Sequence, residues 1–342
     1  MFRGPGGVAW EADRVTRVPR TAFRPSREPS PLAADVVDRI RQLAAEVARF
    51  DGVEALSEAS LLALSGEPAA THLVLGGDRP VGYAQVRREG DQFGPAELLV
   101  HPDARDRGRG TALLTAALAA GAPGVWAHGR LPAAMAVAAA SGLVVQRVLV
   151  LLSREVAGLP TAGPTPAGFA IRGYRGGTDD DALLKVNSRA FVELPDQGSW
   201  NLDDLRLRMR EPWFDPAGLL LLTATAETPQ RGTDTAEAER VVGFHWTKAT
   251  SAAEGEVYVI AVDPGWHGRG LGRYLLLAGL DRLRAQGASR VSLFCDGANA
   301  AALRLYESLG FQVVRSDVVL ARPSADHASA THPAATSGRL GA

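Results

Sequence analysis

A glycine-rich loop between a predicted strand and a predicted helix contains the residue types that bind a charged ligand. The strand covers residues 256–262, Pro264 ends it, and the loop His267-Gly268-Arg269-Gly270-Leu271-Gly272 leads into the helix. The glycines let backbone N–H groups converge on one point at the helix N-terminus. Unpaired donors and the helix dipole both favour an anion, so we expect the loop to bind a diphosphate, with Arg269 and Arg273 adding positive charge.

Two common nucleotide-binding loops do not fit this spacing. A Rossmann site needs its glycines directly after the first strand and an acidic residue about 20 positions later, at the end of a second strand. Here a helix over 270–286 and a loop over 287–289 come first, and the next strand, 291–294, ends in Cys295-Asp296. A P-loop needs Gly-Lys followed by Ser or Thr, which this sequence lacks. The remaining interpretation is a loop for the pyrophosphate of coenzyme A.

The loop occurs twice, because the sequence contains an internal repeat. When Val100-His101-Pro102 is aligned with Val262-Asp263-Pro264, residues 105–110 fall on 267–272 without gaps. Each half then follows the order helix, strand pair, strand, glycine loop, helix, strand, helix, strand. Two unrelated units would not keep this order across so many elements, so the repeat indicates two similar lobes.

The periodicity of each half gives the fold class. Helical spacing of apolar residues predicts helices over 35–50 and 179–191, and a β-branched run predicts the strand over 256–262. We predict an α/β (α+β) protein of two tandem lobes, each a mixed, mostly antiparallel sheet that splays near the glycine loop and is flanked by helices. The predicted divisions are a flexible N-terminal extension (1–31), an N-terminal lobe (32–157), a Pro- and Gly-rich linker (158–168), a C-terminal lobe (169–321) and a flexible tail (322–342).

Composition excludes several classes of protein. The 342 residues carry 37 Lys and Arg against 38 Asp and Glu, a formal charge of −1, so we expect neither a nucleic-acid nor a membrane partner. One cysteine, Cys295, excludes an internal disulfide framework, and the spacing of His245, Asp263 and His267 matches no metal site. The N-terminus has no apolar core of signal-peptide type, and the apolar stretch 131–152 is interrupted by polar residues and a glycine. We therefore expect a cytoplasmic, metal-free monomer.

Two sets of residues carry a resemblance to a known superfamily. Arg105-x-x-Gly108-x-Gly110 and His267-x-x-Gly270-x-Gly272 resemble the acetyl-CoA signature of the GCN5-related N-acetyltransferase (GNAT) superfamily. In the second half the signature is followed by Asn299-x-x-x-x-Arg304-x-Tyr306-x-x-x-Gly310-Phe311, which is typical of the same superfamily.

The tandem arrangement narrows the resemblance. Residues 243–248, 255–259 and 96–102, read with their tandem order, resemble the mycothiol synthases, the two-lobed acetyltransferases of actinobacteria, over residues 32–320. The resemblance implies transfer of acetyl from acetyl-CoA to the cysteinyl amine of the cysteine–glucosamine–inositol precursor, which completes mycothiol.

The chemistry of that reaction suggests two catalytic residues. An amine must lose a proton before it attacks a thioester, and a proton donor helps the thiolate to leave. Glu256, at the start of the strand that leads into the loop, is the candidate base or amine anchor, against the alternative of a solvated strand-end acid. Tyr306 is the candidate acid, against the alternative of a packed aromatic.

The repeat supplies a comparison within the chain. Glu256, Asn299 and Tyr306 are matched in the first half by Gly94, Leu131 and Ala138. We therefore predict that the C-terminal lobe is catalytic. The N-terminal lobe would bind acetyl-CoA without turnover or only complete the substrate cleft.

The resemblance also implies binding residues. For acetyl-CoA in the C-terminal lobe they are Ile260, Ala261, Val262, His267, Gly268, Arg269, Gly270, Leu271, Gly272, Arg273, Asn299, Ala300, Ala301, Ala302, Leu303 and Arg304. In the N-terminal lobe they are Leu98, Leu99, Val100, Asp106, Arg107, Gly108, Arg109, Gly110 and Thr111. For the acceptor they are Glu58, Asp196, Lys248, Glu256 and Phe294.

Three of these positions depart from the family pattern. Asp196 stands where Glu is usual, Phe294 where Tyr is usual, and His267 where Gln or Arg opens the loop. The substitution at Phe294 removes one hydroxyl contact to the acceptor.

Two other functions stay open on the sequence. One is a tandem acetyltransferase for another small amine or for a protein N-terminus. The other is a non-catalytic acetyl-CoA sensor, which the presence of Glu256, Asn299 and Tyr306 in one lobe disfavours.

Overall fold

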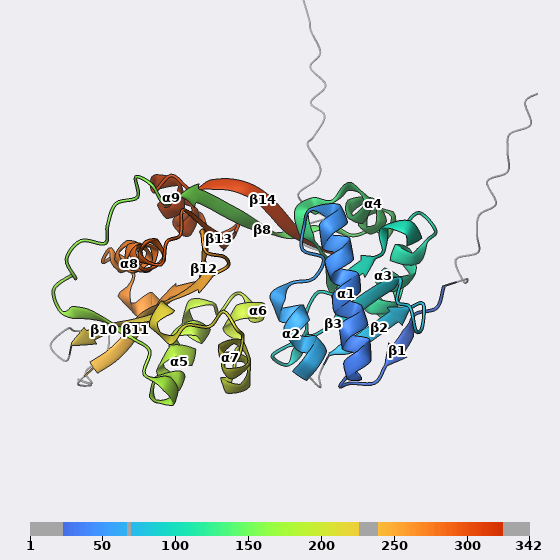
Figure 1. The fold of residues 1–342 in the computed structure, drawn as a ribbon, viewed down its shortest axis with the longest axis horizontal. Helices are drawn as coiled ribbons and strands as arrows, with labels where there is room; N and C mark the ends of the chain where they lie inside the picture. The colour runs from blue at the N-terminus through green and yellow to red at the C-terminus, as the bar shows by residue number, and fades with distance from the viewer. Residues whose placement is uncertain (1–22, 67–69, 226–238, 324–342) are drawn as a thin grey trace, which may run out of the picture.

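The computed structural model describes residues 23–66, 70–225 and 239–323 and contains two lobes joined by long strands (Figure 1). Most of the predicted tail, 324–342, and residues 1–22 of the predicted extension lie outside the described residues. The segment 158–168 joins the lobes and lies on the C-terminal lobe, where the Ala162 N–H donates to Asp281 Oδ2 at 2.9 Å.

The N-terminal lobe has a four-stranded sheet in the order β1-β2-β3-β6, with helices packed on it. Its elements are β1 (Ser26–Glu28), α1 (Ala34–Asp51), α2 (Glu58–Gly66), β2 (Thr71–Leu75), β3 (Gly82–Val86), β4 (Arg88–Glu89), β5 (Gln92–Phe93), β6 (Glu97–Val100), α3 (Arg109–Ala119), β7 (Gly124–Ala127), α4 (Pro132–Ala140) and β8 (Val144–Glu155). The apolar stripe of α1 covers one face and α3 covers the other, as the 3.6-residue period requires.

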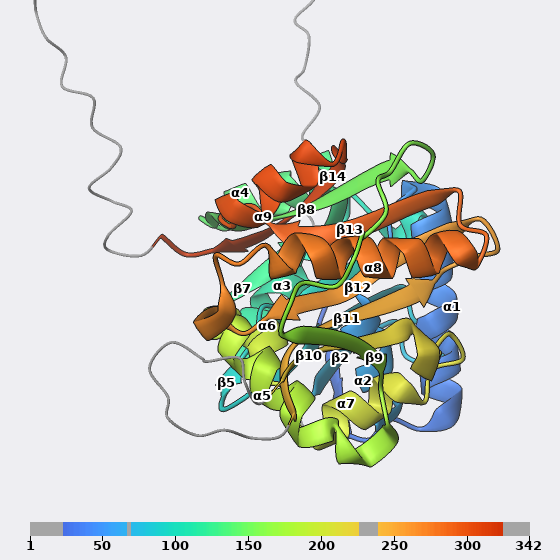
Figure 2. The same cartoon turned by 90° about the vertical axis from the view of Figure 1, so that its left-hand side faces the viewer.

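The C-terminal lobe repeats this order with a longer sheet. Its elements are β9 (Phe169–Gly173), α5 (Asp180–Ala190), α6 (Pro195–Gly198), α7 (Leu202–Met209), β10 (Leu219–Thr225), β11 (Glu239–Ala249), β12 (Glu254–Val262), α8 (Leu271–Ala285), β13 (Arg290–Asp296), α9 (Ala300–Ser308) and β14 (Gln312–Ala321). Helix α8 lies along one face of the sheet and α5 covers the opposite face (Figure 2).

The start of the chain differs from the prediction. Residues 26–28, assigned from the sequence to a flexible extension, form β1 and pair antiparallel with β2, so that Ser26 lies opposite Val74. The segment has no alternating apolar pattern because it is an edge strand, held by backbone pairing and by side-chain hydrogen bonds of Ser26 and Arg27 to β2.

The two lobes exchange strands, which the sequence did not indicate. The eight-stranded sheet runs β7-β14-β8-β13-β12-β11-β10-β9. In it β14 is inserted between β7 and β8 of the N-terminal lobe, and β8 is inserted between β13 and β14 of the C-terminal lobe. Figure 1 shows the two strands crossing from lobe to lobe. Neither lobe completes its hydrogen-bond ladder without the other.

A buried charge cluster fixes β14 in the N-terminal lobe. His128, which follows β7, lies 3.3 Å from Glu97 Oε2 through Nε2 and 3.3 Å from Asp317 Oδ2 of β14 through Nδ1. Asp317 Oδ1 also accepts from the Gly129 N–H at 2.8 Å. Burial alone would lower the pKa of His128, but the hydrogen bonds and charges of the two carboxylates raise it to about 9.

This cluster makes stability depend on pH in a defined direction. The pKa of His128 is about 9 in the folded protein and near 6.5 in the unfolded chain. Protonated His128 therefore stabilises the fold fully below pH 6.5, and this stabilisation is lost as the pH rises through about 9. We expect the free energy of unfolding to fall by about 2 kcal/mol between pH 7 and 9.5 from this residue. Urea titrations across this range measure it. In His128→Gln this fall in the free energy of unfolding should be absent. If the variant shows the same fall between pH 7 and 9.5 as the unmodified protein, His128 is neutral at pH 7.

Candidate functional site

The strands that flank the C-terminal glycine loop diverge. Parallel pairing of β12 with β13 runs from Glu254–Arg290 to Val257–Leu293 and stops there, although β12 continues to Val262. One edge of Ile260–Val262 therefore has no strand partner within the described residues. Its free backbone groups can pair with an extended, amide-containing ligand.

The loop itself has the conformation expected of an anion nest. Gly268 and Gly270 have φ values of 77° and 75°, which L side chains rarely adopt, and Gly270 caps α8 with no side-chain hydrogen bond. The first N–H groups of α8 therefore have no side-chain cap. His267 Nε2 bonds the Val262 carbonyl at 2.8 Å, so this side chain braces the strand end and is engaged away from the nest.

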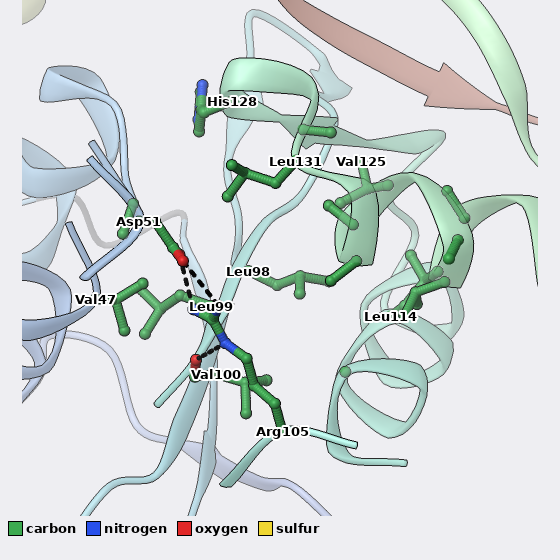
Figure 3. A pocket seen from close by; sticks show the side chains of 18 of the residues that line it. Val47, Asp51, Leu98, Leu99, Val100, Arg105, Leu114, Val125, His128 and Leu131 are labelled. Carbon is green, nitrogen blue, oxygen red and sulfur yellow. Dashed lines mark hydrogen bonds and ion pairs between the residues drawn. The ribbon is translucent and has the colours of Figure 1, made fainter. Parts of the chain in front are cut away.

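The N-terminal loop has the same geometry. Asp106 and Gly108 have φ values of 58° and 76°, and Arg105 Nε bonds the Val100 carbonyl at 3.1 Å, as His267 does in the other lobe. Ala96, the residue before β6, forms a single bridge with Val125 of β7, and the two strands then separate. A cavity of about 310 Å³ opens between them (Figure 3). Residues 98–100, 105–106, 108–111 and the inner face of α4 line it.

Glu256 lies where the two lobes approach each other. In the β11–β12 register it stands opposite Lys248. The register shifts between Trp246, opposite Val259, and Thr247, opposite Val257, which makes Tyr258 an extra, bulged residue. Lys248 Nζ lies 5.2 Å from the Tyr258 ring centroid, so Tyr258 lies on the same side of the sheet as Lys248 and Glu256.

Glu58 joins this cluster from the N-terminal lobe. It is the first residue of α2, and its Oε1 accepts from Lys248 Nζ at 2.6 Å and from Trp213 Nε1 at 3.0 Å. The Lys248 ammonium also lies 4.6 Å from the Trp213 ring centroid. Three of the predicted acceptor residues, Glu58, Lys248 and Glu256, thus meet at one point between the lobes.

The surroundings of Glu256 shift the pKa of its carboxyl. Burial raises its pKa, the Lys248 charge opposes that shift and the Glu58 charge adds to it, with a result of about 7. A carboxyl that titrates near neutrality can take up and release a proton at physiological pH.

The other two predicted acceptor residues lie apart from this cluster. Asp196 on α6 forms an ion pair with Arg147 at 3.1 Å, and Arg147 also binds Asp296 at 2.6 Å. Asp196 Oδ1 is buried without a hydrogen-bond partner among the described residues, so this carboxylate has one unsatisfied acceptor. Phe294 on β13 is 40% exposed.

Tyr306 lies on α9, and Asn299 is the N-cap of that helix. The Asn299 Oδ1 accepts from the Ala302 N–H at 3.0 Å and so caps the helix. Tyr306 is 6% exposed, and its ring packs 5.9 Å from that of Phe311. Burial, with the nearby Cys295, raises the pKa of its hydroxyl, so it is protonated at neutral pH and has a proton to donate.

Two residues of this region, Arg147 and Trp213, lie outside every motif found in the sequence. Arg147 comes from exchanged strand β8, and Trp213 from the segment after α7, and their partners are distant in the chain. Tyr258 lies within the motif 255–259 but was given no role there. The Trp213 indole meets a carboxylate 155 residues away.

Both lobes match acetyltransferase families. Residues 193–311 match the Acetyltransferase (GNAT) family, and residues 68–141 match an Acetyltransferase (GNAT) domain. These matches confirm the predicted tandem GNAT architecture.

Comparison with curated relatives decides the family. The mycothiol acetyltransferase of Thermobispora bispora is 44% identical over 83% of this chain and 95% of its own length. That of Nocardia farcinica is 44% identical over 85% of this chain and 95% of its own length. The chain belongs to the mycothiol acetyltransferase family. It is therefore an N-acetyltransferase, and the resemblance to mycothiol synthases is confirmed.

Solved structures support the fold of this mycothiol acetyltransferase family member. A GCN5-related N-acetyltransferase from Sphaerobacter thermophilus aligns with a TM-score of 0.60 at 23% identity, over 90% of this chain and 98% of the other. A tandem GNAT protein from the clavulanic acid biosynthesis pathway aligns with a TM-score of 0.59 at 20% identity, over 88% and 99%. At these identities the likeness concerns the fold alone.

Two kinds of feature do not occur in the part of this family member that the structure describes. None of its helices there has the length and apolar character needed to cross a bilayer. No group of His, Cys, Asp and Glu side chains among the same residues could hold a metal ion.

The positive charge of Lys248 lowers the pKa of the Glu256 carboxyl. Lys248→Met removes the charge that opposes the effect of burial, so we expect the pKa of Glu256 to rise above 7. Carbon-13 NMR of the glutamate side-chain carboxyls, with Glu256 assigned by its loss in Glu256→Gln, measures the shift. Lys185→Met, at the other lysine of the chain, is the control and should leave it unchanged. A pKa that stays near 7 in Lys248→Met would contradict the electrostatic coupling.

Proposed function

We propose that this chain transfers acetyl from acetyl-CoA to the cysteinyl amine of cysteine–glucosamine–inositol, the last step of mycothiol biosynthesis. The observation that carries the proposal is the cluster of Glu256, Lys248 and Glu58, which both lobes build. Family membership supports the acceptor, since the relatives are mycothiol acetyltransferases.

We assign the acetyl-CoA site of the catalytic lobe, residues 169–321, to the divergence of β12 and β13. The unpaired edge of Ile260–Val262, apart from the Val262 carbonyl that His267 bonds, offers backbone groups to the pantetheine amides, and the nest at 268–272 offers N–H donors to the diphosphate. Arg269, Arg273 and the first turn of α9, Asn299–Arg304, complete the site.

Glu256 and Tyr306 then divide the proton transfers. Glu256 takes a proton from the acceptor ammonium, and the amine nitrogen forms a bond to the thioester carbonyl carbon. The nitrogen of the resulting tetrahedral intermediate loses its second proton to water, the carbon–sulfur bond breaks, and the Tyr306 hydroxyl donates its proton to the departing thiolate. Solvent then takes the proton from Glu256 and reprotonates Tyr306. The pKa of Glu256 near 7 supports its role as the base, because such a carboxyl is present in both the ionised and the protonated form at pH 7.

Carboxylates suit the remainder of the acceptor, which carries many hydroxyl groups. Asp196 accepts hydroxyl hydrogen bonds through its unpartnered Oδ1, and Arg147 holds that carboxylate in place. Phe294 offers an apolar surface to a sugar ring. Glu58 and Lys248 contact the acceptor beside Glu256.

We assign the N-terminal lobe, residues 32–157, to binding acetyl-CoA without turnover. Its loop has the same backbone conformation, but Gly94, Leu131 and Ala138 replace the base, the helix-capping asparagine and the acid. The acceptor therefore reacts in the C-terminal lobe only.

The first experiment measures CoA release by the purified full chain with acetyl-CoA and a panel of amines. We expect release with cysteinyl-glucosaminyl-inositol and little with glucosaminyl-inositol, aminoglycosides or peptide N-termini. Turnover of another amine alone would keep the chemistry and discard the acceptor. Tight acetyl-CoA binding with no turnover of any amine would identify a sensor instead.

Removal of the Tyr306 hydroxyl tests its role as the general acid. Tyr306→Phe should lower kcat by roughly 10- to 1,000-fold, because the thiolate then leaves without a proton donor. Tyr174→Phe, which removes a hydroxyl that donates to Asp180, is the matched control and should retain kcat. Single-turnover rates separate chemistry from product release. An unchanged chemical rate in Tyr306→Phe would exclude general acid catalysis by this hydroxyl.

A further inference from the structure

The cavity of the N-terminal lobe differs from the catalytic site at one structural position. The internal repeat places Ala138 and Leu143 where the C-terminal lobe has Tyr306 and Phe311. Helices α4 and α9 confirm this alignment, because Leu131 and Asn299 are their N-caps and Ala138 and Tyr306 stand seven residues beyond them. The N-terminal lobe thus lacks a packed aromatic pair that the other lobe has.

The space left by the missing tyrosine belongs to the cavity. Ala138 is only 1% exposed and yet lines the cavity of about 310 Å³. Its buried neighbours in the wall are Leu114 of α3 and Val125 of β7, which lie on the same side of the opening in Figure 3. The cavity therefore extends inward to the position of the tyrosine in the repeat.

The inner wall of this cavity is apolar. Leu98, Leu114, Val125, Leu131, Val137 and Ala138 contribute to it. The charged pair at its outer side is neutralised internally, since Arg105 donates to both oxygens of Asp51 at 2.8 and 2.7 Å (Figure 3). A wall of this kind favours a hydrocarbon chain and offers little to the hydroxyl groups of a sugar.

We propose that the N-terminal cavity binds acyl-CoA thioesters whose straight acyl chain is longer than acetyl, of four to six carbons. This rests on the proposed function, which places a coenzyme A site at the N-terminal loop. The loop at 105–110 holds the diphosphate, the free edge of residues 98–100 pairs with the pantetheine, and the acyl chain fills the space beside Ala138. In the C-terminal lobe the Tyr306 ring occupies this space and restricts that site to acetyl.

The two lobes therefore select different acyl chains through one residue of the repeat. An acetyl group leaves the space beside Ala138 unfilled, whereas each further methylene buried there strengthens binding by about fourfold. Because the N-terminal lobe has neither the base nor the acid, the thioester stays intact as a bound ligand.

Calorimetric titration of the full chain with acetyl-, butyryl- and hexanoyl-CoA tests this inference. We expect the chain to bind two equivalents of acetyl-CoA and one equivalent of hexanoyl-CoA. The dissociation constant of hexanoyl-CoA should be at least about tenfold lower than that of acetyl-CoA at the weaker of the two acetyl-CoA sites. Ala138→Tyr should abolish that gain while the protein still binds acetyl-CoA. Ala139→Tyr, on the exposed face of the same helix, is the matched control and should keep it. Thermal unfolding shows whether each variant is folded, and the chain-length series in the unmodified protein needs no variant.

The outcomes separate this inference from the function on which it rests. Two equivalents of acetyl-CoA with weaker binding of the longer chains would overturn the inference and leave the second coenzyme A site in place. One equivalent of acetyl-CoA and none of hexanoyl-CoA would overturn both the inference and the N-terminal site. The acceptor assay, which depends on the C-terminal lobe, would be unaffected in either case. A gain for hexanoyl-CoA that survives in Ala138→Tyr would show that the chain binds elsewhere.

Discussion

Backbone pairing of two exchanged strands, β8 and β14, is the constraint on which the relative position of the lobes depends. Each strand leaves its own lobe and completes the ladder of the other, so the lobes share one continuous sheet. Hydrogen bonds of a ladder fix both distance and direction, which a flexible linker between separate domains does not. The ion pairs of His128 with Glu97 and Asp317 add a fixed point at the centre of the exchange.

This rigid junction explains how a site can be assembled from both lobes. Glu58 starts a helix of the first lobe, and Lys248 and Glu256 stand on neighbouring strands of the second. The 2.6 Å ion pair between Glu58 and Lys248 joins the two lobes directly at this point. Arg147 makes a second connection, since it lies on exchanged strand β8 and binds carboxylates of α6 and β13.

The same backbone arrangement forms both proposed coenzyme A sites. Two neighbouring strands begin in register, separate, and lead through a loop with positive φ into a helix with no side-chain cap. What differs between the lobes is the set of side chains around that arrangement. One lobe has a carboxyl that titrates near pH 7 and a buried tyrosine, whereas the other has an open apolar cavity.

The sequence alone determined the repeat, the two glycine loops and the contrast between Tyr306 and Ala138. These features are local, since a positive φ needs a residue that tolerates it and a helix period shows in the order of residues. It also named Glu256, from its place at the start of the strand that leads into the loop, and it named Glu58 and Lys248 through resemblance to a family. The tertiary structure decided the strand exchange, because ladder hydrogen bonds use backbone groups that every residue has and so leave no residue-specific mark. It also decided which side chains surround Glu256. The Lys248–Glu58 contact joins residues 190 positions apart, and no local pattern specifies such a contact.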